Sequence, residues 1–306
     1  MRAVVLGAAA GGGFPQWNSN AAACRRARAG DPAARARTQA SLAVSADGEH
    51  WFLLNAAPDL RRQIEVTPAL HPRQGLRSSP IAGVVLTGGD VDAIAGLLTL
   101  RERQPFTIHA TSRVLAVLDA NPIFEVLARD IVTRQAVPLG RETPLMAPDG
   151  TRSGLSIELF AVPGKVPLYL ETPGAVPPII EGEETVGVAL TDGSKRLFFI
   201  PGCATMTLPL ARRLQGADLV FFDSTLYTDD EMIHSGTGEK TGRRMGHMSN
   251  AGPDGSIAGF APLGIGRKIC IHINNTNPIL LDDSPERAAV EAAGWEVAYD
   301  GMDVTL

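Results

Sequence analysis

The sequence predicts an α/β protein in which two β-sheets pack together and helices cover their outer faces. Short apolar runs recur along the chain and are separated by turns rich in glycine and aspartate, which is typical of buried strands. Two predicted hairpins occur, one in each half of the chain, and helical stretches lie between the other runs. Because strands and helices alternate in both halves, we expect the sheets inside and the helices outside.

Strands are expected on either side of a middle region that is rich in proline and glycine. This region, residues 136–185, is predicted to be loop with short strands. Helices are expected after Asp59 and over residues 94–100 and 112–120. The predicted strands cover residues 2–6, 40–45, 50–54, 82–86, 106–109, 187–190, 196–200, 217–222, 268–273 and 296–299. No linker interrupts this arrangement, so we expect a single domain over residues 1–306.

The composition is that of a globular enzyme. Apolar residues make up 44% of the chain and charged residues 20%, and the net charge of −5 gives no reason to expect a nucleic acid or a membrane as a partner. No apolar run is long enough to span a membrane, and the apolar N-terminal stretch is too short for a signal peptide. Three cysteines that lie far apart argue against a disulfide framework. We therefore expect a cytoplasmic protein.

The chemistry of the chain is expected at a turn between a strand and a helix. The apolar run at residues 82–86 leads into Thr87-Gly-Gly-Asp90-Val-Asp92-Ala93, which places two carboxylates two residues apart on a flexible turn. A second predicted strand carries His272 at its C-terminal end, the edge where sheets that mix strands and helices usually carry their sites. Asp90, Asp92 and His272 can together ligate one divalent metal, although carboxylates after a strand are also ordinary turn formers.

Longer motifs resemble a known family. The opening Gly7-Ala-Ala-Ala-Gly-Gly-Gly-Phe-Pro-Gln-Trp-Asn18, the segment Thr241-Gly-Arg-Arg-Met-Gly-His247 and the run His272-Ile-Asn-Asn-Thr-Asn-Pro278 are similar to those of the coenzyme pyrroloquinoline quinone (PQQ) synthesis protein B family. The turn at residues 87–93 is similar to the Thr-His-x-His-x-Asp-His motif of metallo-β-lactamase-fold proteins. The resemblance implies one αββα domain, in which two mixed β-sheets are flanked by helices and a metal cleft lies at one edge.

The chain departs from the superfamily motif in ways that reduce the number of metal ligands. Asp92 matches the aspartate of the motif, but Gly88, Asp90 and Ala93 occupy the three histidine positions. Where the two-metal hydrolases carry a bridging aspartate, this chain reads Phe199-Ile-Pro201-Gly202. Too few ligands remain for two metals. The resemblance therefore implies one metal on the two aspartates and the histidine named above, with open positions that suit iron(II); manganese or zinc fits the same ligands.

A structural zinc site is expected to be absent. Members of the family carry Cys-x-Cys-x-x-Cys after the Trp-Asn pair, whereas this chain has Ser19, Ala21 and Cys24 at those positions. A single thiolate cannot hold a structural zinc. Cys24 is therefore expected to be a plain thiol, and Cys203 and Cys270 to be small buried residues.

The resemblance also suggests residues that handle protons. His247 would face the metal and either exchange protons or bind the substrate, because an imidazole titrates near neutral pH. Asp223, at the end of a predicted strand, would hydrogen-bond His247 or orient a water at the metal. The alternative for Asp223 is a turn or helix cap.

Other polar residues are candidates for binding the substrate. Asn274 and Asn275 follow the metal histidine and can hold an amide or a carboxylate, although asparagines in turns commonly bond their own backbone. A charged amino-acid substrate also needs cationic partners for its carboxylates. Near the expected cleft loops these are Arg101, Lys165, Arg243 and Arg244.

The activity that the resemblance implies is iron- and O2-dependent hydroxylation of the tyrosine in a Glu-Tyr unit during PQQ biosynthesis, with O2 as co-substrate. Other proteins of the PQQ pathway are candidate partners. Two alternatives remain open, a metal-dependent hydrolase and a carrier that binds finished PQQ for export. The loss of three histidine positions weighs against the hydrolase, and a hydrolase would need no oxygen. A carrier would not depend on Asp92.

Overall fold

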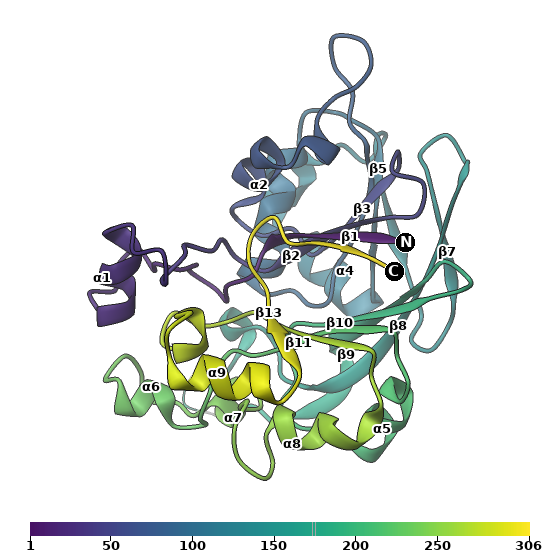
Figure 1. Cartoon of the computed structure of the whole chain (residues 1–306). Coiled ribbons are helices and arrows are strands. Elements are labelled where there is room, and N and C mark those ends of the chain that lie inside the picture. Colours follow the sequence, from purple (N-terminus) through teal and green to yellow (C-terminus); the bar gives the residue numbers. More distant parts are fainter. Residues whose placement is uncertain (173, 175) are drawn as a thin grey trace.

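The chain folds into two β-sheets that pack face to face, with helices on both outer sides (Figure 1). The computed structural model describes residues 1–172, 174 and 176–306. The first sheet contains, in spatial order, β14 (Asp303–Thr305), β1 (Arg2–Gly7), β2 (Ser41–Ser45), β3 (Trp51–Leu54), β4 (Ile81–Val85), β5 (Phe106–Ala110) and β6 (Val132–Ala136). The second contains β13 (Trp295–Val297), β12 (Arg267–Ile271), β11 (Leu219–Asp223), β10 (Arg196–Ile200), β9 (Ile180–Thr191), β8 (Arg152–Gly164) and β7 (Thr143–Met146). The predicted αββα sandwich of two mixed sheets is confirmed.

Each sheet has a parallel part and an antiparallel part. In the first sheet, β14 to β3 pair antiparallel and β3 to β6 pair parallel. In the second, β13 to β10 pair parallel and β10 to β7 pair antiparallel. Parallel strands all end at the same edge of their sheet, which is where sites in mixed sheets are usually found.

Three apolar layers hold the sandwich together. The middle layer lies between the sheets and includes Phe52, Val85 and Phe221. Phe222, the neighbour of Phe221 in β11, packs on the opposite face against helices, because successive strand residues alternate. Strands that are buried on both faces read as continuous apolar runs, which is why the sequence revealed them. Each of these phenylalanines contributes roughly 1.5–3 kcal/mol by its burial.

The outer layers consist of helices. The first sheet is covered by α2 (Leu60–Val66), α3 (Val91–Ile94) and α4 (Ser112–Asp119), and the second by α5 (Leu208–Leu214), α8 (Ser256–Phe260) and α9 (Pro285–Ala292). Figure 1 shows α1 (Ala22–Arg28) and α6 (Glu231–His234) at one side of the sheets. The remaining helical elements are α7 (Gly242–Met245) and the 3-10 helices η1 (Pro68–Leu70), η2 (Ala95–Leu100), η3 (Pro122–Val126), η4 (Leu168–Leu170), η5 (Ala261–Leu263) and η6 (Pro278–Leu280).

The prediction of loop with short strands at residues 136–185 is wrong where two long strands, β8 and β9, occupy this stretch. β8 and β9 are long antiparallel strands that begin and end within or near this stretch, and β7 pairs with β8. Their register shifts between Ala161 and Pro163, so the proline sits at an irregularity that tolerates its missing N–H. Prolines and glycines therefore marked bulges here rather than loops. Residues 173 and 175 of the stretch lie outside the described residues.

No helix in the part of the chain that the structure describes combines the length and the apolar composition needed to cross a bilayer.

The helix expected over residues 94–100 is divided between α3, which begins earlier, and η2.

Candidate metal centre

The predicted metal ligands follow strands of both sheets and meet at one edge of the sandwich. Asp90 and Asp92 follow β4 of the first sheet, and His272 follows β12 of the second. An isolated bridge between Gly88 and Thr185 connects the two sheets beside them. Residues that are far apart in the sequence thus come together where parallel strands end.

Asn55 fixes the start of the loop that carries the two carboxylates. Its side-chain amide donates to Thr87 Oγ1 over 2.9 Å, and its Oδ1 accepts the Thr87 N–H over 2.9 Å. Asp90 occupies the N-cap position of α3, yet its side chain does not cap that helix. Among the described residues, the Asp90 carboxylate has no hydrogen-bond donor. It is therefore available to a ligand.

His272 has a strained backbone next to the carboxylates. Its φ of 57° is left-handed, a conformation that costs a residue with a side chain roughly 1–2 kcal/mol. Its Nε2 lies 2.9 Å from Asp92 Oδ2. Two donor atoms on one octahedral ion, each about 2.1 Å from it, lie roughly 3 Å apart, so this spacing suits a shared cation. Strain of this kind concentrates at functional sites.

Asp223 is fully buried and orients His247. Its Oδ2 accepts hydrogen bonds from His247 Nδ1 (2.7 Å) and from the Cys203 N–H (3.0 Å). Its Oδ1 accepts from the hydroxyl (2.7 Å) and the N–H (3.0 Å) of Thr225. The expected contact between Asp223 and His247 is therefore present. Both oxygens of Asp223 are already occupied by protein donors.

Thr225, which the sequence reasoning missed, connects the two imidazoles. Its hydroxyl lies 2.8 Å from His272 Nδ1 and 3.1 Å from His247 Nδ1, and the two rings stack with their centroids 5.2 Å apart. Since the hydroxyl proton goes to Asp223, its oxygen accepts the proton that His272 carries on Nδ1. Nε2 of His272 can then lie 2.9 Å from Asp92 only with a proton or another cation between the two atoms.

The charges of this cluster shift pKa values as expected for a cation site. Burial, and then the charge of Asp92, raise the pKa of Asp90 to about 6. Burial also raises the pKa of Asp92, but the hydrogen bond with His272 and the charges of the two imidazoles together lower that pKa overall. Burial lowers the pKa of His272, but the same hydrogen bond and the charges of the neighbouring carboxylates together make the net change upward. Neighbouring carboxylates that repel each other are stabilised by a cation.

Two candidate sets of metal ligands share His272, but only one of them has its three donor atoms close together among the described residues. In one set, the donor atoms of Asp223, His247 and His272 lie within 4.8 Å of one another. In the other, Asp90 and Asp92 join His272 and line the same cavity of about 260 Å³. The carboxylates distinguish the sets, because the oxygens of Asp223 have protein donors and those of Asp90 do not. The free carboxylate of Asp90 is the feature that keeps the second set as the candidate predicted from the sequence.

Asn274 and Asn275 lie beside the imidazoles, as expected, but in a second cavity. This cavity measures about 580 Å³, and His247 and His272 line both cavities. The side-chain amide of Asn275 donates to Gln16 Oε1, and that of Asn274 donates to a neighbouring threonine. Part of their hydrogen-bonding capacity is thus used within the protein.

Arg101 and Arg243 are not placed at the candidate metal centre. Arg101 is exposed and donates to a backbone carbonyl of its own segment, 3.1 Å away. Arg243 is exposed and lies 3.7 Å from Asp254. Neither arginine is among the described residues that line the two cavities. The reason for Arg243 is local, because successive side chains of α7 point in different directions.

Lysines, rather than these arginines, bring positive charge to the metal cavity. Lys165 and Lys240 both line it. Lys165 was among the residues considered from the sequence, whereas Lys240 was missed. Its position just before the segment Thr241-Gly-Arg-Arg-Met-Gly-His247 is the signal that could have indicated it.

The three cysteines are buried and free of disulfides. Burial raises the pKa of Cys203 and Cys270 to about 12, so both remain thiols at neutral pH. This confirms the prediction of small buried residues. Cys24 lies in α1 with its Sγ 3.7 Å from Asn275 Oδ1. The absence of a structural zinc there stays a prediction.

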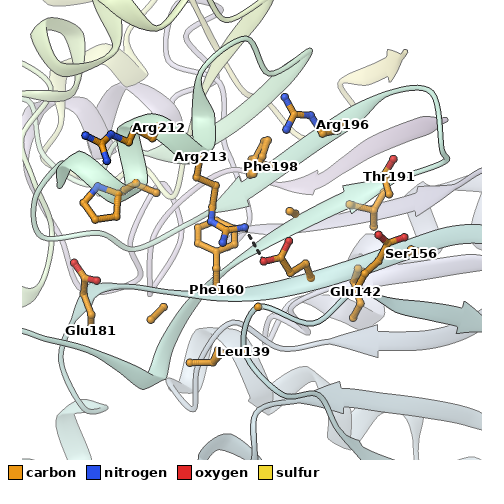
Figure 2. Close-up of a pocket in the computed structure, with 18 of the residues that line it drawn as sticks. Leu139, Glu142, Ser156, Phe160, Glu181, Thr191, Arg196, Phe198, Arg212 and Arg213 are labelled. Atoms are coloured by element: carbon orange, nitrogen blue, oxygen red, sulfur yellow. Dashed lines mark hydrogen bonds and ion pairs between the residues drawn. The ribbon is translucent and has the colours of Figure 1, made fainter.

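A larger hollow lies elsewhere, on the outer face of the second sheet (Figure 2). This outer groove, of about 950 Å³, is formed by β8, β9, β10 and α5. In Figure 2 the Arg213 side chain lies over the Phe160 ring, and its guanidinium carbon is 4.7 Å from the ring centroid. Arg213 also binds Glu158 over 2.8 Å. The groove contains none of the predicted site residues.

Known proteins resemble this chain over its whole length. The family model of the β-lactamase superfamily domain matches residues 50–273, which include every candidate metal ligand. Coenzyme PQQ synthesis protein B of Gluconacetobacter diazotrophicus is 66% identical over 99% of this chain and 98% of its own, and that of Methylorubrum populi is 55% identical over all of both chains. The solved structure of Zn2+-bound PqqB from Methylobacterium extorquens has a TM-score of 0.96 at 53% identity and covers 100% of both chains. The chain therefore belongs to the coenzyme PQQ synthesis protein B family within the β-lactamase superfamily.

Proposed function

We propose that this protein hydroxylates the tyrosine of a Glu-Tyr unit in PQQ biosynthesis, using iron(II) and O2. The observation that carries the proposal is the group formed by Asp90, Asp92 and His272. It brings two carboxylates and one imidazole together, and only one of the carboxylates is paired within the protein. Three ligands that leave coordination positions open are typical of non-haem iron oxygenases, although the usual ratio is two histidines to one carboxylate.

A single metal is supported by residues that border the cavity without supplying ligands. Gly88, at a histidine position of the superfamily motif, and Gly202, in the segment where the bridging aspartate would lie, both line the cavity. A Cβ added at Gly88 would lie 3.5 Å from Asp90 Oδ2, and one at Gly202 would lie 3.6 Å from His247 Cε1. These positions are close enough to take part but hold no donor atom. A two-metal hydrolase is correspondingly disfavoured.

The metal in this site would supply the one-electron chemistry that couples O2 to an aromatic ring, and manganese or zinc would compete for the same ligands. The Zn2+ in the solved relative supports a divalent ion here, while iron remains our proposal. Hydroxylation inserts one oxygen atom into a ring C–H bond and reduces the other to water. The balance requires two electrons and two protons from an external reductant.

The protein's own contribution is to hold the ring nitrogens and move a proton. Asp223 accepts the Nδ1 proton of His247, which leaves Nε2 of this imidazole to exchange a proton with the phenol. Thr225 holds the Nδ1 proton of His272 and so fixes which nitrogen faces the metal ligands. Asn274 and Asn275 would bind the peptide part of the substrate in the second cavity. The same proposal places the protein in the cytoplasm, with other proteins of the PQQ pathway as partners.

The test is reconstitution with and without iron. Protein loaded anaerobically with iron(II) should retain about one metal per chain and, with a reductant and air, add the mass of one or two oxygen atoms to L-Glu-L-Tyr. Labelled O2 should place the heavy isotope in the product. Oxygen gain without iron, or none with iron bound, would defeat the proposal. Cleavage of a substrate in the absence of oxygen would favour the hydrolase, and tight PQQ binding that survives Asp92→Asn would favour the carrier.

A further inference from the structure

Three basic side chains converge on one carboxylate at the metal cavity. Lys165 Nζ lies 2.8 Å from Glu171 Oε1, while Arg244 Nη2 and Lys240 Nζ lie 3.5 Å and 4.0 Å from Glu171 Oε2. The side chains of Glu171 and Lys165 are only 9% and 13% exposed. We call these four residues the Glu171 cluster.

The Glu171 cluster has more positive charge than its own carboxylate can balance. Three cations surround one anion, and the hydrogen bond from Lys165 holds the pKa of Glu171 below its usual value. In the described part of the chain, Nη1 of Arg244 is buried without a hydrogen-bond acceptor. A buried charged donor without a partner is unfavourable. The cluster is therefore built to accept a further or a different anion.

Two members of the cluster line the metal cavity, whereas Glu171 and Arg244 are not among its described lining residues. Lys165 and Lys240 line this cavity together with Asp90 and His272. A Cβ added at Gly246, the neighbour of His247, would lie 3.4 Å from Lys165 Cγ, so the loop before His247 packs on this lysine. An anion on these lysines would thus lie next to the candidate metal ligands.

Glu171 belongs to a strap, residues 166–172, that lies beside the cavity. Leu168 of the strap lines the cavity, and the Tyr169 hydroxyl donates to the Gly89 carbonyl over 2.5 Å. Leu168, Tyr169 and Leu170 are 63%, 46% and 50% exposed. Because these large apolar side chains are half exposed, little apolar burial opposes a shift of the strap.

We propose that Lys165, Lys240 and Arg244 form the subsite for a substrate carboxylate, and that Glu171 occupies this subsite until the substrate displaces it. The glutamyl side chain of a dipeptide ends in the same group as Glu171 and can accept the same charged hydrogen bonds. The inference rests on the proposed function for the identity of the dipeptide. The ion pairs inside the cluster are otherwise an ordinary structural link for the strap, and binding experiments separate the two readings.

The decisive variant removes the internal competitor. L-Glu-L-Tyr, L-Gln-L-Tyr and glutarate are titrated calorimetrically into metal-loaded, oxygen-free protein, so that no turnover occurs. Glu171→Gln is expected to bind Glu-Tyr and glutarate roughly five- to tenfold more tightly than the original protein, because its subsite is always open. Its affinity for Gln-Tyr should stay within about twofold. Lys165→Met should weaken the two acidic ligands by about tenfold or more.

Lys195→Met is the matched control, since it removes the same charge from an exposed lysine that pairs with Asp218. It should bind all three ligands as the original protein does, and thermal unfolding should show that every variant is folded.

The inference is overturned if Glu171→Gln binds the acidic ligands no more tightly, if Lys165→Met weakens Gln-Tyr as much as Glu-Tyr, or if no acidic ligand binds. Selective binding without oxygen transfer would leave the subsite in place and remove the hydroxylase proposal. Equal binding and equal hydroxylation of both dipeptides would support the hydroxylase proposal and overturn the carboxylate subsite.

Discussion

The metal cavity and the outer groove differ in size and in how their charged groups are satisfied. The outer groove, at about 950 Å³, is much larger than the metal cavity, at about 260 Å³. In the groove (Figure 2), Arg213 binds Glu158 and lies on an aromatic ring. In the metal cavity, Asp90 has no donor among the described residues, and His272 holds a left-handed backbone.

The comparison shows that the volume of a cavity does not indicate whether its charged groups are free to bind a ligand. A groove forms where helices leave part of a sheet uncovered, and its charges can be balanced by neighbours on that surface. Unbalanced charge and backbone strain destabilise the folded protein, and they persist where a ligand or a reaction requires them. This criterion favours the smaller cavity as the candidate site.

Removing a metal ligand should have the largest effect. Asp92→Asn is expected to lower the affinity for iron(II) by more than about a hundredfold and to abolish oxygen uptake. This loss exceeds the roughly 10–100-fold loss that is typical when a residue that only orients a metal ligand is removed. Metal content after dialysis and an oxygen electrode measure the two effects. Glu158→Gln removes a carboxylate from the outer groove and should change neither. If both variants lost iron affinity and oxygen uptake equally, the metal cavity and the outer groove would not differ in function.

Thr225 tests whether positioning alone matters in the metal cavity. Thr225→Val keeps the shape of the side chain but removes the hydroxyl that lies 2.8 Å from His272 Nδ1 and donates to Asp223. We expect iron affinity to fall by about 10–100-fold, as for other groups that orient ligands. Thr225→Ser restores the hydroxyl and should recover most of this loss. If the valine variant binds iron normally, the connection between the imidazoles has no part in the site.

His109 tests whether an unpartnered, buried titratable group is enough to mark a site. It lies on β5, is 2% exposed and has no hydrogen-bond partner on either ring nitrogen within the described residues. Burial lowers its pKa to about 4. The unfolded chain, with a pKa near 6.5, therefore binds the proton first as the pH falls, and the free energy of unfolding decreases between about pH 6.5 and pH 4.

His109→Leu should remove this dependence. Relative to the original protein, the variant should gain about 2 kcal/mol of unfolding free energy between about pH 7 and pH 5, measured by urea denaturation. Iron binding and oxygen uptake at neutral pH should not change, because His109 lines neither cavity that contains His272 among the described residues. A loss of iron binding would show that burial without a partner identifies functional groups more broadly than the comparison allows.

The sequence predicted the sandwich, and it indicated the candidate metal ligands, because both depend on local signals. Apolar runs marked β4 and β12, and the aspartates and the histidine stood directly at the ends of these runs. The motif that follows His272 and the motif that precedes His247 then indicated the family. Such signals need no knowledge of how distant segments meet.

What the sequence could not supply depends on contacts between distant segments. Thr225 looks like any threonine after a strand, and only folding places its hydroxyl between two imidazoles. The cations were misplaced because Arg243 and Arg244 are neighbours on α7 that point in different directions, and only Arg244 reaches Glu171. β8 and the first part of β9 were missed because proline and glycine were taken as loop signals, although Pro163 lies at an irregularity of strand pairing.

The smallest effect is expected in the outer groove itself. Arg213→Ala removes a half-exposed ion pair with Glu158 and a contact with the Phe160 ring. Exposed ion pairs contribute about 0.2–1 kcal/mol and exposed cation–π contacts about 0.5–1 kcal/mol, so unfolding in urea should show a loss of about 1 kcal/mol. Iron affinity and Glu-Tyr binding should remain unchanged, because the balanced charges of the groove act only on stability. A change in iron affinity or in Glu-Tyr binding would mean that the outer groove also serves the reaction. Charges that are paired within the protein would then not distinguish a structural surface from a functional one in this fold.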